Sequence, residues 1–383
     1  MRYLRIGTVP AKHHTQFRQS DGSLYTEELF GTRGFSGRSS TLYHIHPPTR
    51  VSAVKRLEAR VLEGIVDAPL QHRHLRTRKL TPSGDPVSGR IPLCFNNDVI
   101  LSCVHTAEQM TYLFKNADSD EVLYVHRGAG RLTSPFGTLP YASGDYLVIP
   151  RGVVYQLVED AVGTEIFVIE SASPIEIPRR YRNEYGQLLE HAPYRERDIR
   201  GPETLETHDA GGAHDVRILA RGAFHLYRYD FHPFDVVGWD GYVFPYAFSI
   251  HDYQPITGQV HLPPPIHQTF EAKNFVICSF VPRMLDYHPL AVPAPYNHSN
   301  IDSDEVLYYA NDRFASRRGI EEGSVTLHPS GIPHGPQPGA TEHSIGKTHT
   351  EELAVMVDTF YPLNLTPQAL GIEAPDYPMS WLG

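Results

Sequence analysis

The chain contains one phrase twice, as "NADSDEVLYV" at Asn116–Val125 and "NIDSDEVLYY" at Asn300–Tyr309. A second phrase follows each copy, as "GDYLVIPRGVVY" at Gly144–Tyr155 and "GSVTLHPSGIPH" at Gly323–His334. Two phrases that recur in the same order indicate two copies of one structural unit. Each copy alternates short branched or aromatic runs with glycine-containing turns, which is typical of β-strands joined by hairpins.

The two phrases of each copy resemble the paired motifs of a cupin, a double-sheet jelly roll, and the whole chain therefore resembles a bicupin. The expected fold class is all-β, a duplicated cupin with few helices. A charged stretch at residues 178–203 separates the copies. It predicts an N-terminal cupin-like domain without metal ligands at residues 1–190, and a C-terminal catalytic cupin domain at residues 191–383.

Local patterns outside the repeat are weaker. One helix candidate, Ala53–Gly64, also fits a strand of alternating residues. We expect loops at Pro135–Gly144 and Asp286–His298, where glycine or proline recurs. The stretch before Ile100 has no counterpart in the second copy, and we expect it to add strands that cover the first cupin.

Composition limits the classes of function. The chain has 383 residues, 40% of them hydrophobic, which suits a folded globular protein. A net charge of -10 argues against nucleic-acid binding. The three cysteines lack CxxC spacing, which favours a reducing compartment and excludes a thiolate metal site. Because there is no apolar leader and no long apolar run, we expect a soluble cytoplasmic protein with no membrane partner.

The two copies differ at the places where a metal could bind. The first copy has Phe114, Glu121 and Tyr155, and the second has His298, Glu305 and His334 at the same positions. Two imidazoles and one carboxylate are the ligand set of non-haem Fe(II) oxygenases, and they leave one face of the metal open. This difference predicts a metal site in the second copy only. Because Glu121 persists in the first copy, the glutamate could also serve the strand structure.

Other candidate ligands are weaker. Asp304 is a rival carboxylate, although strand alternation should point it away from its neighbour. The pairs His44/His46 and His72/His74 have HxH spacing, but nothing around them supplies the rest of a site.

Four segments resemble the homogentisate 1,2-dioxygenase family. They are "APYNHSNIDSDEV" (Ala294–Val306), "VTLHPSGIPHGPQPG" (Val325–Gly339), "HLPPPIHQTFEAK" (His261–Lys273) and "EELFGTRGFSGRSSTLYHIHPPT" (Glu27–Thr49). The first two match a His-x-Asn followed by a Glu, and an L-H-x(4)-P-H-G-P, which close the site in that family. The resemblance reaches both ends of the chain, the middle matches only the cupin pattern, and the chain looks like the shorter bacterial branch.

The resemblance implies ring cleavage, in which homogentisate and O2 become maleylacetoacetate in the catabolism of tyrosine and related aromatic compounds. It implies Fe(II) as the cofactor, held by His298, Glu305 and His334. It also implies that His261 is the catalytic acid/base residue, whose imidazole takes the phenolic proton. The implied partners are a small aromatic substrate and O2, and the implied assembly is a trimer-based homo-oligomer.

The chain departs from the better-known branch of the family at several positions. Phe314 stands where that branch has a tyrosine that helps at the substrate, Ser299 replaces an arginine, and Gln337 replaces an aspartate. Counted without a gap, Asp304 takes the place of the ligand glutamate. The departures at Phe314, Ser299 and Gln337 bear on the substrate more than on the metal.

Several residues are candidates for holding the substrate. They are Asn300, Phe314, His328 and Arg317, and Arg283, Arg313 and Arg318 are further cations that could bind an anionic group. Two alternatives stay open: the same chemistry on another hydroquinone-type or gentisate-like aromatic, and a non-catalytic bicupin that binds a small molecule. Gentisate enzymes of the cupin class tend to use three histidines, so Glu305 favours the homogentisate type.

Overall fold

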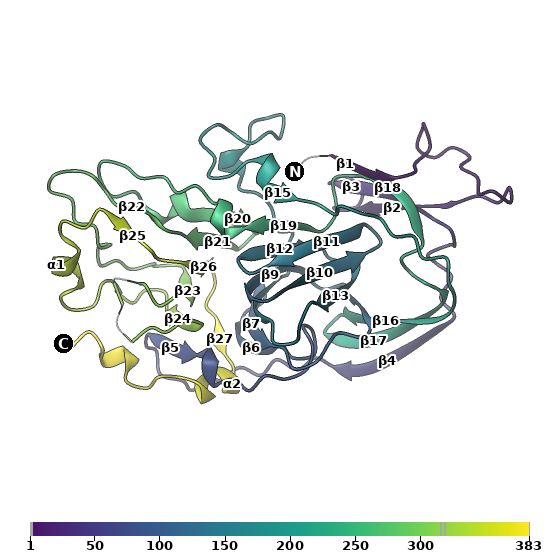
Figure 1. The fold of residues 1–383 in the computed structure, drawn as a ribbon. Coiled ribbons are helices and arrows are strands. Elements are labelled where there is room, and N and C mark those ends of the chain that lie inside the picture. The colour runs from purple at the N-terminus through teal and green to yellow at the C-terminus, as the bar shows by residue number, and fades with distance from the viewer. Residues whose placement is uncertain (1–2, 315, 318, 383) are drawn as a thin grey trace.

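The computed structural model describes residues 3–314, 316–317 and 319–382, which form an almost wholly β structure (Figure 1). The described residues include two short α-helices, α1 (Ala340–Ser344) and α2 (Pro367–Gly371). They also include short 3-10 helices at Thr77–Lys79, Arg179–Tyr181, Glu196–Asp198, Ile250–Asp252, Pro264–His267 and Tyr377–Met379. No helix in these ranges has the length and apolar character that crossing a membrane requires. The all-β expectation is confirmed.

The N-terminal half is a jelly roll of two large sheets. One has the spatial order β15 (Ile199–Arg200), β19 (Tyr246–Ser249), β12 (Asp145–Ile149), β9 (Asp120–Arg127), β14 (Glu165–Ser171), β7 (Val99–His105), β6 (Ile91–Phe95) and β27 (Asn364–Leu365). The other has the order β11 (Gly137–Ala142), β10 (Ala129–Ser134), β13 (Val154–Glu159), β8 (Leu113–Asn116), β16 (Gly211–Ala220), β17 (Ala223–Phe231) and β4 (Ala53–Ala59). Side chains of both sheets, including Leu123, Leu132 and Phe167, belong to one buried apolar cluster.

The C-terminal half is built on one sheet. Its spatial order is β20 (Gln268–Glu271), β21 (Phe275–Phe280), β26 (Ala354–Thr359), β23 (Asp304–Tyr309), β24 (Ser324–His328) and β5 (Arg73–Arg76). Two smaller sheets complete the molecule, the pair β22 (Arg283–Met284) and β25 (His349–Thr350), and the order β1 (Leu4–Gly7), β18 (Val236–Gly241), β3 (Ser39–His44) and β2 (Thr26–Gly31). The two halves lie beside each other, and the yellow-green C-terminal half carries the longer loops (Figure 1).

Both halves repeat one strand order. It runs β12-β9-β14-β7 in the N-terminal half and β24-β23-β26-β21 in the C-terminal half. The repeated phrases also make the same backbone bonds, because the Gly144 N–H donates to Val125 O and the Gly323 N–H donates to Tyr309 O, each at 2.8 Å. Both glycines have positive φ, 91° and 83°, which glycine adopts without steric cost. The fold is therefore a duplicated cupin, as expected.

Each half includes strands from the other part of the chain, and β19 and β5 are a matching pair among them. β19 comes from sequence after residue 190 but pairs with β12, with Phe248 opposite Tyr146. β5 comes from the first hundred residues but pairs with β24, with Leu75 opposite Val325. The two borrowed strands occupy matching places beside the matching strands β12 and β24. The boundary near residue 190 stays a prediction, and neither half holds all the strands of its own sheet.

Three local expectations have different outcomes. The helix candidate Ala53–Gly64 begins with strand β4, because residues 53–59 pair antiparallel with β17. The loop expected at Pro135–Gly144 contains β11, an edge strand on which Pro140 is tolerated because an edge position needs fewer ladder bonds. The loop expected at Asp286–His298 is irregular, apart from one isolated bridge at its end.

Candidate metal centre and substrate cavity

Three predicted residues converge in the C-terminal cupin. Glu305 is the second residue of β23, and His298 and His334 lie on two loops that meet in one isolated antiparallel bridge. In that bridge the backbone N–H of each histidine donates to the backbone carbonyl of the other at 2.8 Å. One ligand atom of each residue lies within 4.8 Å of the other two, and the described ranges hold no second cluster of this kind.

The imidazoles present their Nε2 atoms to the carboxylate. His334 Nε2 lies 3.4 Å from Glu305 Oε1, and His298 Nε2 lies 3.9 Å from Glu305 Oε2. His334 Nε2 is buried and has no hydrogen-bond partner within the described part of the chain. A buried, unpartnered nitrogen next to a carboxylate is costly unless a further group satisfies both. A divalent cation satisfies both, and this donor set fits one.

Backbone carbonyls orient both imidazoles in the same way. His298 Nδ1 lies 3.2 Å from Tyr296 O, and His334 Nδ1 lies 3.3 Å from Ile332 O. With Nδ1–H donating to these carbonyls, each Nε2 keeps its lone pair for a metal. The backbone of each loop therefore favours the tautomer with the proton on Nδ1, which a metal ligand bound through Nε2 needs.

A third histidine holds Glu305 from behind. His328 is fully buried, with Nδ1 2.7 Å from Glu305 Oε1 and Nε2 3.3 Å from the Tyr377 hydroxyl. Burial lowers the pKa of His328 to about 3, so the ring is neutral and donates Nδ1–H to the carboxylate. Burial would raise the pKa of Glu305, but the imidazoles of His298, His328 and His334 outweigh it and hold the pKa well below its usual range. Glu305 is therefore an ionised carboxylate.

The rival carboxylate, Asp304, points elsewhere. Its Oδ1 accepts from Ser330 N–H and its Oδ2 accepts from Leu363 N–H, both at 2.8 Å. In the first repeat Asp120 does the same with two backbone N–H groups, those of residues 151 and 175, at 3.0 Å each. The aspartate of the repeated phrase therefore ties loops to the sheet in both halves, and the glutamate faces the centre.

The candidate centre opens onto a cavity of about 350 Å³. His298 and Glu305 lie on its wall, together with apolar or aromatic side chains that include Leu307, Phe280 and Phe314. The two phenylalanine rings lie edge to face with centroids 6.2 Å apart. A cavity of this size with aromatic walls suits a small aromatic ring.

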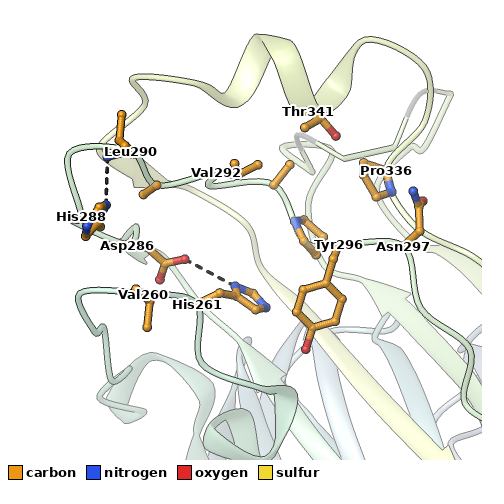
Figure 2. Close-up of a pocket in the computed structure, with 13 residues that line it drawn as sticks. Val260, His261, Asp286, His288, Leu290, Val292, Tyr296, Asn297, Pro336 and Thr341 are labelled. Atoms are coloured by element: carbon orange, nitrogen blue, oxygen red, sulfur yellow. Dashed lines mark hydrogen bonds and ion pairs between the residues drawn. The ribbon is translucent and has the colours of Figure 1, made fainter.

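His261 lines this cavity and an adjoining one of about 480 Å³ (Figure 2). Its Nδ1 lies 3.4 Å from Asp286 Oδ2, and its ring meets Tyr296 edge to face at 5.0 Å. Tyr296 in turn neighbours His298 at 6.0 Å between ring centroids. The predicted acid/base residue therefore has access to the cavity and a carboxylate partner, Asp286, that the repeated phrases did not indicate.

The predicted substrate contacts divide into two groups. Phe314 and Arg317 line the cavity, as do Arg283 and Arg313, whereas Asn300 and His328 are absent from its walls. The backbone carbonyl of Asn300 accepts a hydrogen bond from the Gly331 N–H at 2.7 Å. The His328 imidazole is hydrogen-bonded to the Glu305 carboxylate. Arg318 lies outside the described residues.

The matching place in the N-terminal half is filled by protein. Arg90 forms an ion pair with Glu121, and its Nη2 donates to the Tyr155 hydroxyl at 3.1 Å. That hydroxyl donates to Glu121 Oε2 at 2.7 Å, and Phe114 packs edge to face on the Tyr155 ring at 5.6 Å. Arg90 and Glu121 are both buried. A guanidinium is thus the counter-ion of Glu121, in the half where no metal was expected.

Comparisons with known proteins agree with this description. A family model described as homogentisate 1,2-dioxygenase N-terminal matches residues 6–250, a range that ends before the candidate centre. A Saccharolobus solfataricus protein, whose name provisionally calls it a dioxygenase, is 46% identical over 99% of this chain and 98% of its own. Homogentisate 1,2-dioxygenases of Rhodopseudomonas palustris are more distant. The enzyme of strain BisB18 is 26% identical over 98% of this chain and 90% of its own length. The enzyme of strain BisA53 is 27% identical over 73% of this chain and 64% of its own length.

Solved cupin structures match this chain at low identity and low TM-score. A cupin 2 conserved barrel domain protein of Leptotrichia buccalis has 10% identity and a TM-score of 0.35, over 77% of this chain and 99% of its own. A mutant of Bacillus subtilis oxalate decarboxylase has 11% identity and a TM-score of 0.31, over 84% of this chain and 81% of its own. These likenesses concern the fold alone.

Proposed function

The chain belongs to the homogentisate 1,2-dioxygenase family, and we propose that it is an Fe(II)-dependent ring-cleaving dioxygenase that converts homogentisate and O2 to maleylacetoacetate. The observation that carries this proposal is the cluster of His298, Glu305 and His334 at the wall of a cavity with aromatic and cationic side chains. Such a reaction belongs to the catabolism of tyrosine and related aromatic compounds.

The protein supplies a preformed set of ligands. Bound Fe(II) would supply Lewis acidity and electrons for O2, with free positions for substrate and O2. The ionised carboxylate of Glu305 would lower the charge at the centre, and the carbonyl-bound imidazoles of His298 and His334 would fix its place. His328 keeps the carboxylate from turning away by its 2.7 Å hydrogen bond.

His261 is suited to move the phenolic proton. Its Nδ1 faces Asp286 at 3.4 Å, which favours the tautomer with Nδ1–H and leaves Nε2 free to accept a proton. After that transfer the imidazolium would lie beside the Asp286 carboxylate, which stabilises its positive charge. General-base assistance of this kind typically contributes ~10²–10⁴-fold to the rate.

Arg317 is the cation best placed for the acetate arm of the substrate. Arg283 already forms an ion pair with Glu352 at 3.1 Å, whereas Arg317 donates to a neutral carbonyl, Gly335 O. Burial would lower the pKa of Arg317, but nearby tyrosines and Glu305 outweigh it and keep the guanidinium charged. Because its guanidinium donates to Gly335 O, next to His334, Arg317 lies on the metal side of the cavity. In homogentisate the acetate arm is attached beside one ring hydroxyl, so a cation on that side can hold the arm while this hydroxyl faces the centre.

Identification of the product tests the proposal. Anaerobically Fe(II)-loaded protein would be exposed to O2 with homogentisate, gentisate or unsubstituted hydroquinone, and the products analysed by mass spectrometry and proton NMR. We expect homogentisate to gain two oxygen atoms and lose its aromatic protons. Ring opening of gentisate or hydroquinone, with homogentisate intact, would retain the dioxygenase and replace its substrate.

A further inference from the structure

A buried histidine on the cavity wall has one ring nitrogen without a hydrogen bond in the described part of the chain. His267 ends the 3-10 helix Pro264–His267 and is only 6% exposed, yet its ring lines the cavity that contains Glu305. Its Nδ1 is buried and makes no hydrogen bond within the described ranges. A buried imidazole that lacks a hydrogen bond at one nitrogen is unfavourable, and a ligand in the cavity that this residue lines can supply one.

The surroundings hold this ring in place. The Tyr253 hydroxyl donates to Ile266 O at 2.5 Å, which fixes the backbone directly before His267. The imidazole packs on the Phe280 ring with centroids 4.6 Å apart. The neighbouring wall residue Phe314 is also apolar, and His267 is a neutral polar group on this side of the cavity.

The chemistry of this wall favours a hydroxyl over a carboxylate. Burial, with the nearby charges of Arg283 and His261, lowers the pKa of His267 to about 3, so the imidazole is neutral. Arg283 is compensated by its ion pair with Glu352, whose carboxylate also lines the cavity and would repel a second one. A phenolic O–H can donate to a neutral imidazole nitrogen without adding charge.

We propose that His267 hydrogen-bonds the second ring hydroxyl of the substrate, the one para to the hydroxyl that faces His261 and the metal. His267 is then a specificity residue, which makes the enzyme select a hydroquinone over a phenol. The inference rests on the proposed function, because it takes a para-dihydroxylated ring as the substrate. It also assigns the ends of the cavity, with Arg317 at the acetate arm and His267 at the remote hydroxyl.

Anaerobic titration calorimetry tests this assignment without turnover. Homogentisate and 2-hydroxyphenylacetate, which lacks only the second hydroxyl, would be bound to the Fe(II)-loaded wild type and to His267→Phe. We expect the wild type to prefer homogentisate by roughly tenfold, and His267→Phe to lose that preference while its affinity for 2-hydroxyphenylacetate changes little. His267→Gln, which keeps a polar side chain, should recover part of the preference.

A second histidine of the same cavity provides the matched control. His349 lines its mouth with a side chain that is 63% exposed, and His349→Phe should retain the wild-type preference. Equal preference in the wild type and in a folded His267→Phe would overturn the role of His267 and leave the proposed function intact. Failure of the wild type to bind either compound, despite bound iron, would overturn both proposals. The far-ultraviolet circular dichroism and melting temperature of each variant would be measured to establish folding.

Discussion

The glutamate of the repeated phrase has a different partner in each half. Glu121 meets the guanidinium of Arg90, and Glu305 meets the Nε2 atoms of His298 and His334. Both are buried carboxylates, which must be neutralised to remain in the interior. The persistence of Glu121 in the first copy therefore follows from an internal cation at the matching place.

Removal of the guanidinium leaves a buried charge. We expect Arg90→Met to lower the free energy of unfolding by about 3–5 kcal/mol, because the Glu121 carboxylate loses its counter-ion. Urea denaturation measures this loss. Iron content should stay that of the wild type, because the predicted ligands lie in the other half. An unchanged unfolding free energy, or loss of iron from a folded variant, would contradict the account.

The orphaned nitrogen of His334 gives the sharpest prediction for the metal. His334→Ala should lose bound iron while its fold persists, because the residue lies on a loop and is not part of the buried apolar clusters. Elemental analysis of anaerobically loaded and desalted protein measures the iron. His74→Ala, in which a buried histidine bonded to Ser324 is removed from β5, should keep its iron. A fully iron-loaded His334→Ala protein would remove His334 from the ligand set.

Sequence reasoning reached the three clustered residues because they lie in the repeated phrases or directly beside them, where a difference between copies stands out. His267 and Asp286 lie outside those phrases. Their roles depend on a cavity wall and on a loop that bring together residues distant in sequence. His328 and Asn300 were assigned to the substrate from motif position alone. Strand register places His328 opposite Glu305, whose carboxylate it bonds, and Asn300 is absent from the cavity wall.

At the scale of elements, the strands with repeated phrases were predictable and the isolated ones were not. The segment Ala53–Ala59 has residues that suit either a helix or a strand. It forms a strand because it pairs with β17. The loop expected at Pro135–Gly144 becomes strand β11 because the hairpin with β10 continues through it. Local patterns lacked this information, since the deciding partners come from elsewhere in the chain.

One buried histidine joins three strands of the small N-terminal sheet. His44 ends β3, its Nδ1 lies 2.7 Å from Asp235 just before β18, and its Nε2 lies 3.0 Å from Glu28 on β2. Burial alone would lower the pKa of His44, but the two carboxylates outweigh it and raise the pKa to about 9. The protonated ring is therefore favoured in the folded state, relative to an ordinary value of ~6.5.

The sign of the pH effect follows from this upward shift. Stabilisation by His44 is fully present below pH ~6.5 and is lost as the pH rises toward 9, by up to about 3 kcal/mol. The difference in unfolding free energy between wild type and His44→Gln should shrink over that window, as urea denaturation at several pH values would show. The matched variant His14→Gln, at an exposed histidine paired with Glu27, should change far less. A difference that is constant or grows with pH would contradict the assignment.

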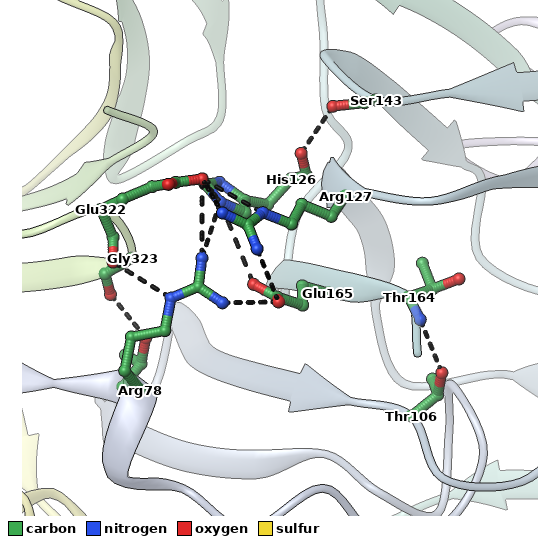
Figure 3. Close-up of polar contacts among 10 residues, drawn as sticks. Arg78, Thr106, His126, Arg127, Ser143, Thr164, Glu165, Glu322 and Gly323 are labelled. Atoms are coloured by element: carbon green, nitrogen blue, oxygen red, sulfur yellow. Dashed lines mark hydrogen bonds and ion pairs between the residues drawn. The ribbon is translucent and has the colours of Figure 1, made fainter. Parts of the chain in front are cut away.

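At the scale of the molecule, the two halves are joined by core and by charge. Tyr308 of β23 stacks on Phe167 of β14 with centroids 4.8 Å apart. The Glu322 carboxylate meets His126 Nε2 at 2.8 Å and Arg127 Nη2 at 2.7 Å across the junction (Figure 3). With the borrowed strands β5 and β19, these contacts make the halves depend on one another. Duplication was readable from the repeat, but which half each short strand would join depends on pairing at long range.

Unfolding should therefore be one cooperative event. We expect a single calorimetric transition for the whole chain, because neither sheet is complete without a strand of the other half. A fragment of residues 1–190, which lacks β15 to β19 and β27, should show no cooperative transition of its own. Two separate transitions, or a fragment that folds, would show that the borrowed strands are dispensable.

Oxygen uptake tests the central claim most directly. Protein loaded anaerobically with one Fe(II) per chain would receive homogentisate in an oxygen-electrode cell, with His334→Ala in parallel. The account predicts one O2 consumed per homogentisate by the wild type and none above background by the variant. No uptake by the wild type, despite bound iron and substrate, would contradict ring cleavage at this centre.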